Sequence, residues 1–159
     1  MAMSGRDLVV GVVPGQPPAV VDTAVEWAQV CRATRVHFVY VDPSRISVDG
    51  TGHEEPIDPD SASALREDWE RQLRDDLDRR LSESGIPWDF HYLVGAPDRV
   101  LAALADKVDA AVLIVGTRRR GFWQDLRELV DGSVAVALCR DQRRPVVVVP
   151  QHPASGGGR

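Results

Sequence analysis

The stretch LVVGVVPGQPP, residues 8–18, decides the fold class of this chain. Its first six residues form a continuous apolar run rich in valine, and a dense cluster of proline and glycine follows at once. Continuous rather than alternating hydrophobicity is typical of a strand that is covered on both faces, as in a parallel sheet. The stretch therefore predicts a buried parallel strand and the tight turn that leaves its carboxyl end.

Strand and helix patterns alternate over the rest of the chain, beginning with a helical spacing of apolar residues from Ala19. Further strands are expected at residues 35–41, 88–94, 110–115 and 145–149. Further helices are expected at residues 62–84, 97–107 and 133–140. Residues 44–61 are rich in proline, glycine and acidic side chains, and are expected to form a long exposed loop. This alternation predicts an α/β fold, a five-stranded parallel sheet with helices on both faces.

Length and charge narrow the class of protein. The 159 residues fit one domain, expected at 1–150, with a disordered tail at 151–159. Because the hydrophobic content is 43% and the charged content 27%, a disordered chain or a membrane protein is not expected. A net charge of -5 also argues against nucleic-acid binding, which draws strength from neutralised phosphates. No signal peptide or transmembrane run is recognised, so a cytoplasmic protein is predicted.

The cysteines and histidines give no sign of a metal centre or a reactive thiol. Cys31 and Cys139 are far apart in apolar surroundings and are expected to be buried packing residues. Trp69 on the long helix is likewise expected in the core. The four histidines are scattered over separate segments without the spacing of metal ligands: His37, His53, His91 and His152. No metal site is therefore predicted.

Five short segments occur in an order and at spacings that resemble a known family. They are AVEWA (24–28), VGAP (94–97), DAAVLIVGT (109–117), GSV (132–134) and RPVVVV (144–149). Together with the first strand they resemble the universal stress protein family in its single-domain form, over most of residues 8–150. The resemblance implies the adenine-nucleotide alpha-hydrolase-like fold with strand order 3-2-1-4-5. It also implies a dimeric cytoplasmic module that binds or signals in the stress response, with no catalytic centre.

The last strand predicts how such a dimer forms. Four consecutive valines at a sheet edge would be exposed to water, which proteins normally avoid: Val146, Val147, Val148 and Val149. Members of the resembled family pair this strand with that of a second copy about a two-fold axis. A homodimer through this edge is therefore expected.

ATP-binding members of the family carry an Asp after the first strand and a phosphate loop. The loop motif is Gly, two residues, Gly, nine residues, then Gly and Ser or Thr. This chain has Pro14 where the Asp is expected, and proline offers neither a carboxylate nor an N–H. Gly116 matches the start of the motif, but Arg119 stands at the inner glycine, and twelve residues lie between it and the final glycine where the motif has nine. If Gly121 is taken as the inner glycine, ten residues separate it from the final glycine, but four residues rather than two then separate it from Gly116.

Two interpretations of this altered loop remain. In the preferred one the protein does not bind ATP in the standard way, Arg118 to Arg120 form a solvated loop, and Ser133 is only a helix cap. In the alternative, arginines replace the backbone cradle, and ATP with Mg²⁺ binds in an altered pocket. That pocket would be contacted by Val13, Gly15, Val41, Gly116, Arg118, Arg119, Gly121, Gly132 and Ser133. A third class, an enzyme such as a weak ATPase, lacks a general base in the sequence.

Overall fold

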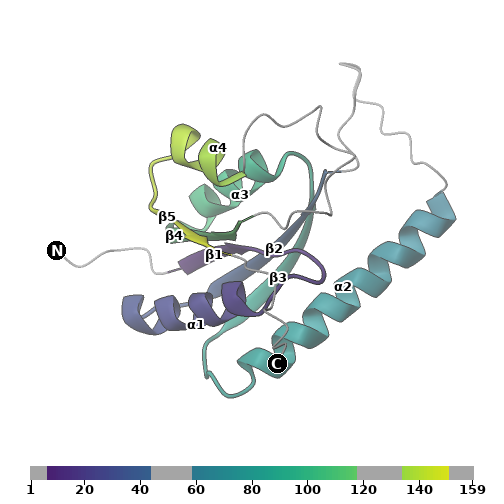
Figure 1. The fold of residues 1–159 in the computed structure, drawn as a ribbon, viewed down its shortest axis with the longest axis horizontal. Helices are drawn as coiled ribbons and strands as arrows, with labels where there is room; N and C mark the ends of the chain where they lie inside the picture. The colour runs from purple at the N-terminus through teal and green to yellow at the C-terminus, as the bar shows by residue number, and fades with distance from the viewer. Residues whose placement is uncertain (1–6, 44–58, 118–133, 151–159) are drawn as a thin grey trace, which may run out of the picture.

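Nine strands and helices alternate in the computed structural model, which describes residues 7–43, 59–117 and 134–150. The elements are β1 (Asp7–Gly11), α1 (Ala19–Cys31), β2 (Val36–Asp42), α2 (Pro59–Leu81), β3 (Trp88–Val94), α3 (Pro97–Lys107), β4 (Ala110–Gly116), α4 (Val134–Asp141) and β5 (Val146–Val149). The predicted alternation of strands and helices is confirmed (Figure 1). The tail expected at 151–159 lies outside the described residues. Within the described ranges, no helix is both long and apolar enough to cross a membrane.

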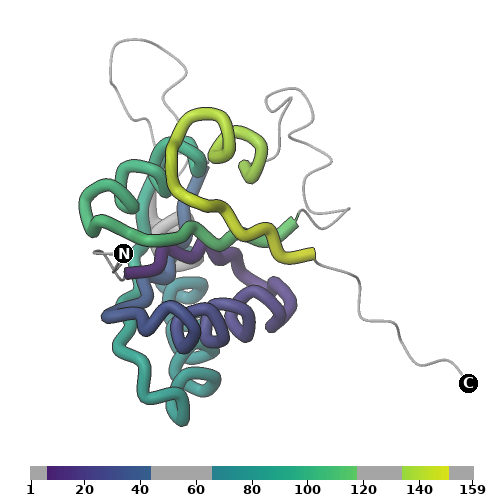
Figure 2. The backbone as a smooth tube through the Cα atoms, turned by 90° about the vertical axis from the view of Figure 1, so that its left-hand side faces the viewer, coloured from purple at the N-terminus to yellow at the C-terminus, as the bar shows by residue number. Residues whose placement is uncertain are grey.

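The strands form one parallel sheet with the order β3-β2-β1-β4-β5, as the resemblance implies. β1 lies at the centre, where Val9 is in register with His37 of β2 and with Leu113 of β4. α1 and α2 cover one face of the sheet, and α3 and α4 cover the other (Figure 2). The chain therefore folds into three layers, with helices on both faces of the sheet as the sequence predicts.

The burial of β1 confirms why its sequence is a continuous apolar run. Leu8, Val9 and Val10 are each 0% exposed. Leu8 and Val10 pack toward α1 and α2, whereas Val9 packs toward α3 and α4. Because successive side chains of a strand point to opposite faces, the middle of a central strand with helices on both sides has no position left for a polar residue, and the polar Asp7 lies at the first, half-buried position.

The boundaries of α2 differ from those expected. The helix begins at Pro59 rather than at residue 62, so it takes the last part of the loop expected at 44–61. Proline is tolerated in the first turn of a helix, where its missing N–H costs little. Residues 44–58 lie outside the described part of the chain. The helix ends at Leu81, and Gly85 follows the turn with a φ of +66° that favours glycine.

Three residues expected in the core are not fully buried. Trp69 is exposed, although Leu73, Leu77 and Leu81 of the same helix are buried. Residues four apart advance by about 40° around a helix at each step, because a turn holds 3.6 residues. Trp69 has thus rotated away from the sheet-facing stripe. Cys31 is half-buried and Cys139 is exposed, so the expectation that both are buried is wrong.

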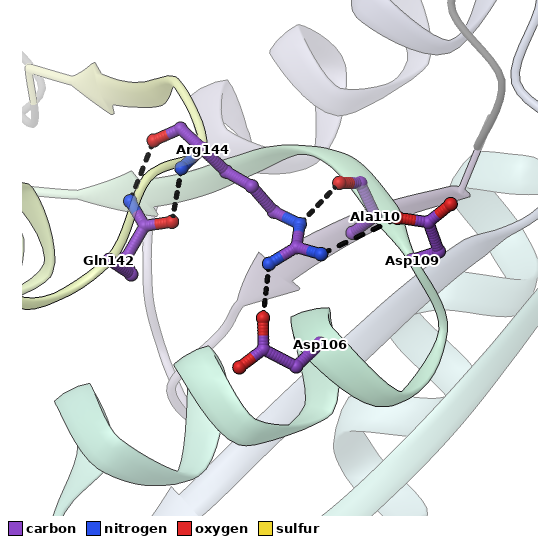
Figure 3. Close-up of polar contacts among 5 residues, drawn as sticks. All are labelled: Asp106, Asp109, Ala110, Gln142 and Arg144. Atoms are coloured by element: carbon purple, nitrogen blue, oxygen red, sulfur yellow. Dashed lines mark hydrogen bonds and ion pairs between the residues drawn. The ribbon is translucent and has the colours of Figure 1, made fainter.

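Arg144 joins three elements at the amino end of the sheet (Figure 3). Its guanidinium donates to the carbonyl of Ala110 at the start of β4, with an Nε–O distance of 2.6 Å. The same group forms ion pairs with Asp106 at the end of α3 and with Asp109 in the turn that follows. The Gln142 side chain bonds the backbone N–H and carbonyl of Arg144, which holds the entry to β5.

We predict that Arg144→Ala lowers the free energy of unfolding by about 1–3 kcal/mol, because it removes charge-assisted hydrogen bonds around a largely buried group. Urea unfolding followed by circular dichroism measures the change. Arg143→Ala is the matched control, since it removes the same charge from an exposed neighbour. We expect it to change stability by less than about 0.5 kcal/mol. Equal losses in the two variants would contradict the role given to Arg144.

Candidate functional site

The order of the strands marks the carboxyl ends of β1 and β4 as the candidate site. The chain moves from β1 to β2 and β3 on one side, then crosses to β4 and β5 on the other. The connections that leave β1 and β4 therefore diverge, and ligands of open parallel sheets bind in the crevice outside such strand ends. Two segments follow these strands here, residues 12–18 after β1 and Thr117 after β4.

Four of the residues expected at a nucleotide site lie at this edge of the sheet. Val13 and Gly15 follow β1, Gly116 ends β4, and Val41 lies next to the last position of β2. Since these three strands are adjacent, the structure brings the four residues to the same edge. The remaining expected residues lie outside the described part of the chain: Arg118, Arg119, Gly121, Gly132 and Ser133.

The loop after β1 is closed by the side chain of Gln16, which lies within it. The Val13 N–H donates to the Gln16 Oε1 atom at 3.0 Å, and the Gln16 N–H donates to the Val13 carbonyl. Gly15 has a φ of +70°, which a glycine adopts without strain and which this tight turn requires. Pro14 occupies the turn without any side-chain polar atom. Gln16 was not expected at the site, although it comes directly after the Pro14-Gly15 break.

The carboxyl ends of β2 and β3 hold a second polar pair. The Tyr92 hydroxyl donates to the Asp42 carboxylate, and the Tyr40 and Tyr92 rings meet edge to face with centroids 5.6 Å apart. Burial and the nearby Asp42 raise the pKa of Tyr40 to about 12. Burial and the bond to Asp42 also raise the pKa of Tyr92. Both phenols are therefore neutral hydrogen-bond donors at physiological pH and unsuited to act as bases.

A third polar cluster lies toward the amino ends of β1, β2 and β3. His37 Nδ1 is 3.0 Å from His91 Nε2, and His37 Nε2 is 3.0 Å from the Asp7 carboxylate. Asp89 lies beside them and forms an ion pair with Arg35. His37 and His91 come from separate segments without the spacing of metal ligands, as the sequence shows, but the fold brings their rings together. His53 and His152 lie outside the described residues.

A buried imidazole lies at the centre of this cluster. His37 is 6% exposed, and it is buried despite being polar. Burial, and next the neighbouring His37, lower the pKa of His91. No local sequence pattern signals the cluster, because the two histidines are separated by 54 positions and meet only through the pairing of β2 with β3.

We predict that stability falls as the pH rises from about 10 to about 12, in part because of Tyr40. An unfolded tyrosine has a pKa of about 10, whereas the folded pKa of Tyr40 is about 12. The unfolded state then releases its proton first, so the stabilisation present below pH 10 is lost across this window. Urea unfolding at several pH values should show a shallower loss in Tyr40→Phe than in the unchanged protein. An equally steep loss of stability in the two proteins would contradict the raised pKa of Tyr40.

Comparisons with known proteins agree with the fold. The family model described as the universal stress protein family matches residues 6–150. No curated protein sequence matches the chain significantly. A solved protein of this family from Burkholderia pseudomallei is similar in structure, with 25% identity and a TM-score of 0.63. The match covers 91% of this chain and 96% of that one.

Two further structures share the fold at lower identity. The universal stress protein from Archaeoglobus fulgidus in complex with dAMP is 22% identical with a TM-score of 0.59, over 90% of this chain and 96% of that one. A universal stress protein in complex with cAMP is 21% identical with a TM-score of 0.60, and the match covers 94% of this chain and 99% of that one. The family model spans nearly the whole chain, and the strand order is that of the adenine-nucleotide alpha-hydrolase-like fold. This chain belongs to the universal stress protein family.

Proposed function

We propose that this protein is a dimeric, cytoplasmic stress-response module that binds or signals without holding ATP in the standard way. The observation that supports this most is the loop after β1. The position that resembles the family's adenosine-binding Asp is Pro14, which has no side-chain carboxylate to accept a hydrogen bond from a nucleotide. No catalytic residue is assigned.

The geometry of the loop adds to this proposal. The Val13 N–H, a donor at the crevice, is already taken by the Gln16 side chain. A ligand that used this N–H would first have to displace the amide, and the displaced group would need another partner. The Val13 N–H is therefore satisfied without a ligand, although the Nε2 atom of the same Gln16 amide is buried with no hydrogen-bond partner among the described residues.

The alternative is an adenine-nucleotide protein with an altered pocket. It is favoured by the convergence of Val13, Gly15, Val41 and Gly116 at one edge of the sheet. Structurally similar proteins in complex with cAMP and with dAMP also support it. In this version Arg118 and Arg119 would hold the phosphates of ATP, with Mg²⁺, in place of a glycine-rich loop.

We predict that calorimetric titration with Mg-ATP gives no saturable heat for the unchanged, nucleotide-free protein. Pro14→Asp should gain binding, because a carboxylate returns to the position that proline occupies. Pro18→Asp is the matched control, since it adds the same charge a few residues further along the loop, where α1 begins. It should remain without binding.

Binding at micromolar strength by the unchanged protein, about -8 kcal/mol, would overturn the proposal and support the alternative. Replacing Arg118 and Arg119 by Ala should then weaken that binding. The purified protein is checked beforehand for carried-over nucleotide, and phosphate release tests for a weak ATPase.

The proposed dimer rests on the outer edge of β5, which has no further strand beside it among the described residues. This strand is the last of the sheet, and Val148 is 40% exposed there. The carbonyl of Val149 accepts a hydrogen bond from the Thr117 N–H, and the carbonyl of Pro145 accepts one from the Leu113 N–H. Both carbonyls therefore face β4. The backbone of Val148, one position away, therefore faces outward and offers its polar groups to a partner strand.

We predict that Val148→Lys converts the dimer to a monomer, because it adds a charge to the apolar edge on the two-fold axis. Sedimentation at micromolar concentration measures the mass. Val30→Lys, at a valine of α1 that is 80% exposed, is the control and should leave the dimer intact. A monomeric unchanged protein at that concentration would refute the dimer.

A further inference from the structure

The polar cluster near the amino ends of β1, β2 and β3 has the donor set of a metal site. His37 of β2 is in register with Asp89 of β3, and His91 lies two residues further along the same strand. Because alternate residues of a strand share a face, the three side chains project from the α3 and α4 face of the sheet. Their nearest ligand atoms all lie within 4.8 Å of one another.

Asp7 fixes the tautomer that a metal would require. Its carboxylate accepts from His37 Nε2 at 3.0 Å, which assigns the proton to that nitrogen. The lone pair of Nδ1 then points toward His91 and Asp89. A carboxylate on the far nitrogen of a ligating histidine is the usual outer partner in protein metal sites, where it orients the ring and raises its basicity.

The distances suit a small tetrahedral ion. His37 Nδ1 is 3.0 Å from His91 Nε2 and 3.9 Å from Asp89 Oδ2. A tetrahedral Zn²⁺ ion with ligands at about 2.0–2.1 Å separates its donor atoms by about 3.3 Å, which lies between these values. We propose that His37 Nδ1, His91 Nε2 and Asp89 Oδ2 bind a divalent transition metal ion of the Zn²⁺ class, with Asp7 as the outer partner of His37.

The ion pair of Asp89 leaves one of its oxygens available to a metal. Arg35 pairs with the Oδ1 atom of Asp89 at 2.9 Å, whereas the Oδ2 atom of Asp89 is turned toward His37. Lys107, at the end of α3, is close enough to interact electrostatically with His91, and its positive charge would repel a metal cation. Asp7 and Asp89 contribute two negative charges against the two cations. Two neutral imidazoles and one carboxylate are a common donor set for zinc, with the fourth position left to water.

The cluster reaches the surface at Asp89. The His37 ring is buried, whereas the Asp89 side chain is 44% exposed on the edge strand β3. An ion would therefore enter past Asp89 and replace the hydrogen bond between the two rings, and the proton of His91 Nε2 would move to the other nitrogen of that ring or to water. Bound there, it would tie β2 to β3 at the end of the sheet away from the nucleotide crevice. The site is thus independent of the proposed function.

Calorimetric titration of the chelator-treated full chain with Zn²⁺ tests the proposal. We expect one ion per chain, a rise in the melting temperature on binding, and a tetrahedral Co²⁺ absorption spectrum when Co²⁺ is used as the probe. Asp7→Asn should weaken binding by about 10–100-fold, as expected of an outer partner. His91→Ala should weaken it further, and Asp89→Asn should also reduce it.

The controls use the remaining ligand-type residues. The chain has four histidines and two cysteines, so a variant with His53→Ala and His152→Ala, and another with Cys31→Ser and Cys139→Ser, should bind Zn²⁺ as before. Loss of binding in either control, with retention in His91→Ala, would overturn the proposal. So would the absence of saturable binding at micromolar Zn²⁺.

A measurement on the unchanged chain covers the case in which a variant fails to fold. The ¹⁵N chemical shifts of the imidazoles report both tautomer and metal ligation. On addition of Zn²⁺ the shifts of His37 Nδ1 and His91 Nε2 should move, and those of His53 and His152 should not. The reverse pattern would place the ion elsewhere and refute the site.

Discussion

The rest of the structure depends on the complete burial of β1. With Leu8, Val9 and Val10 all removed from water, this strand requires a neighbour on each side and a helix layer on each face. Those requirements exclude an edge position and an open face. The chain meets them by placing β2 and β3 on one side of β1 and β4 and β5 on the other. The change of direction after β3 produces the crevice at the carboxyl ends of β1 and β4.

The same constraint decides where polar side chains are found. Between the two ends of β2 the side chains of Phe38, Val39, Tyr40 and Val41 are buried, so polar groups concentrate at the ends of the strand. Asp42 meets Tyr92 at one end, and His37 meets Asp7 and His91 at the other. A buried imidazole without partners would be costly, and the two contacts of His37 offset that cost.

Sequence alone was sufficient for the features that depend on local patterns. The continuous apolar run of β1 predicted a doubly covered strand, and the family resemblance implied the strand order. Features that depend on register were missed. His37 and His91 meet because Val39 pairs with His91 across β2 and β3, and no spacing within either strand encodes that alignment. The burial of Trp69 was wrongly predicted because residues spaced four apart gradually change their direction around a helix. The role of Gln16 was missed because it depends on the conformation of one loop.

The two edges of the sheet are protected differently, which bears on the proposed dimer. At β3, Arg66 and Arg74 of α2 lie over the rings of Tyr92 and Phe90, at 5.5 Å and 5.3 Å from the ring centroids. Charged side chains beside an edge strand disfavour pairing with another chain. β5 presents exposed Val148 instead. If both edges were equally open, β5 of one copy would pair with β3 of the next, and a head-to-tail contact of that kind extends into a filament. Because charged side chains lie beside β3 whereas β5 presents an exposed valine, we expect β5 to pair with β5, in a contact that closes after two copies.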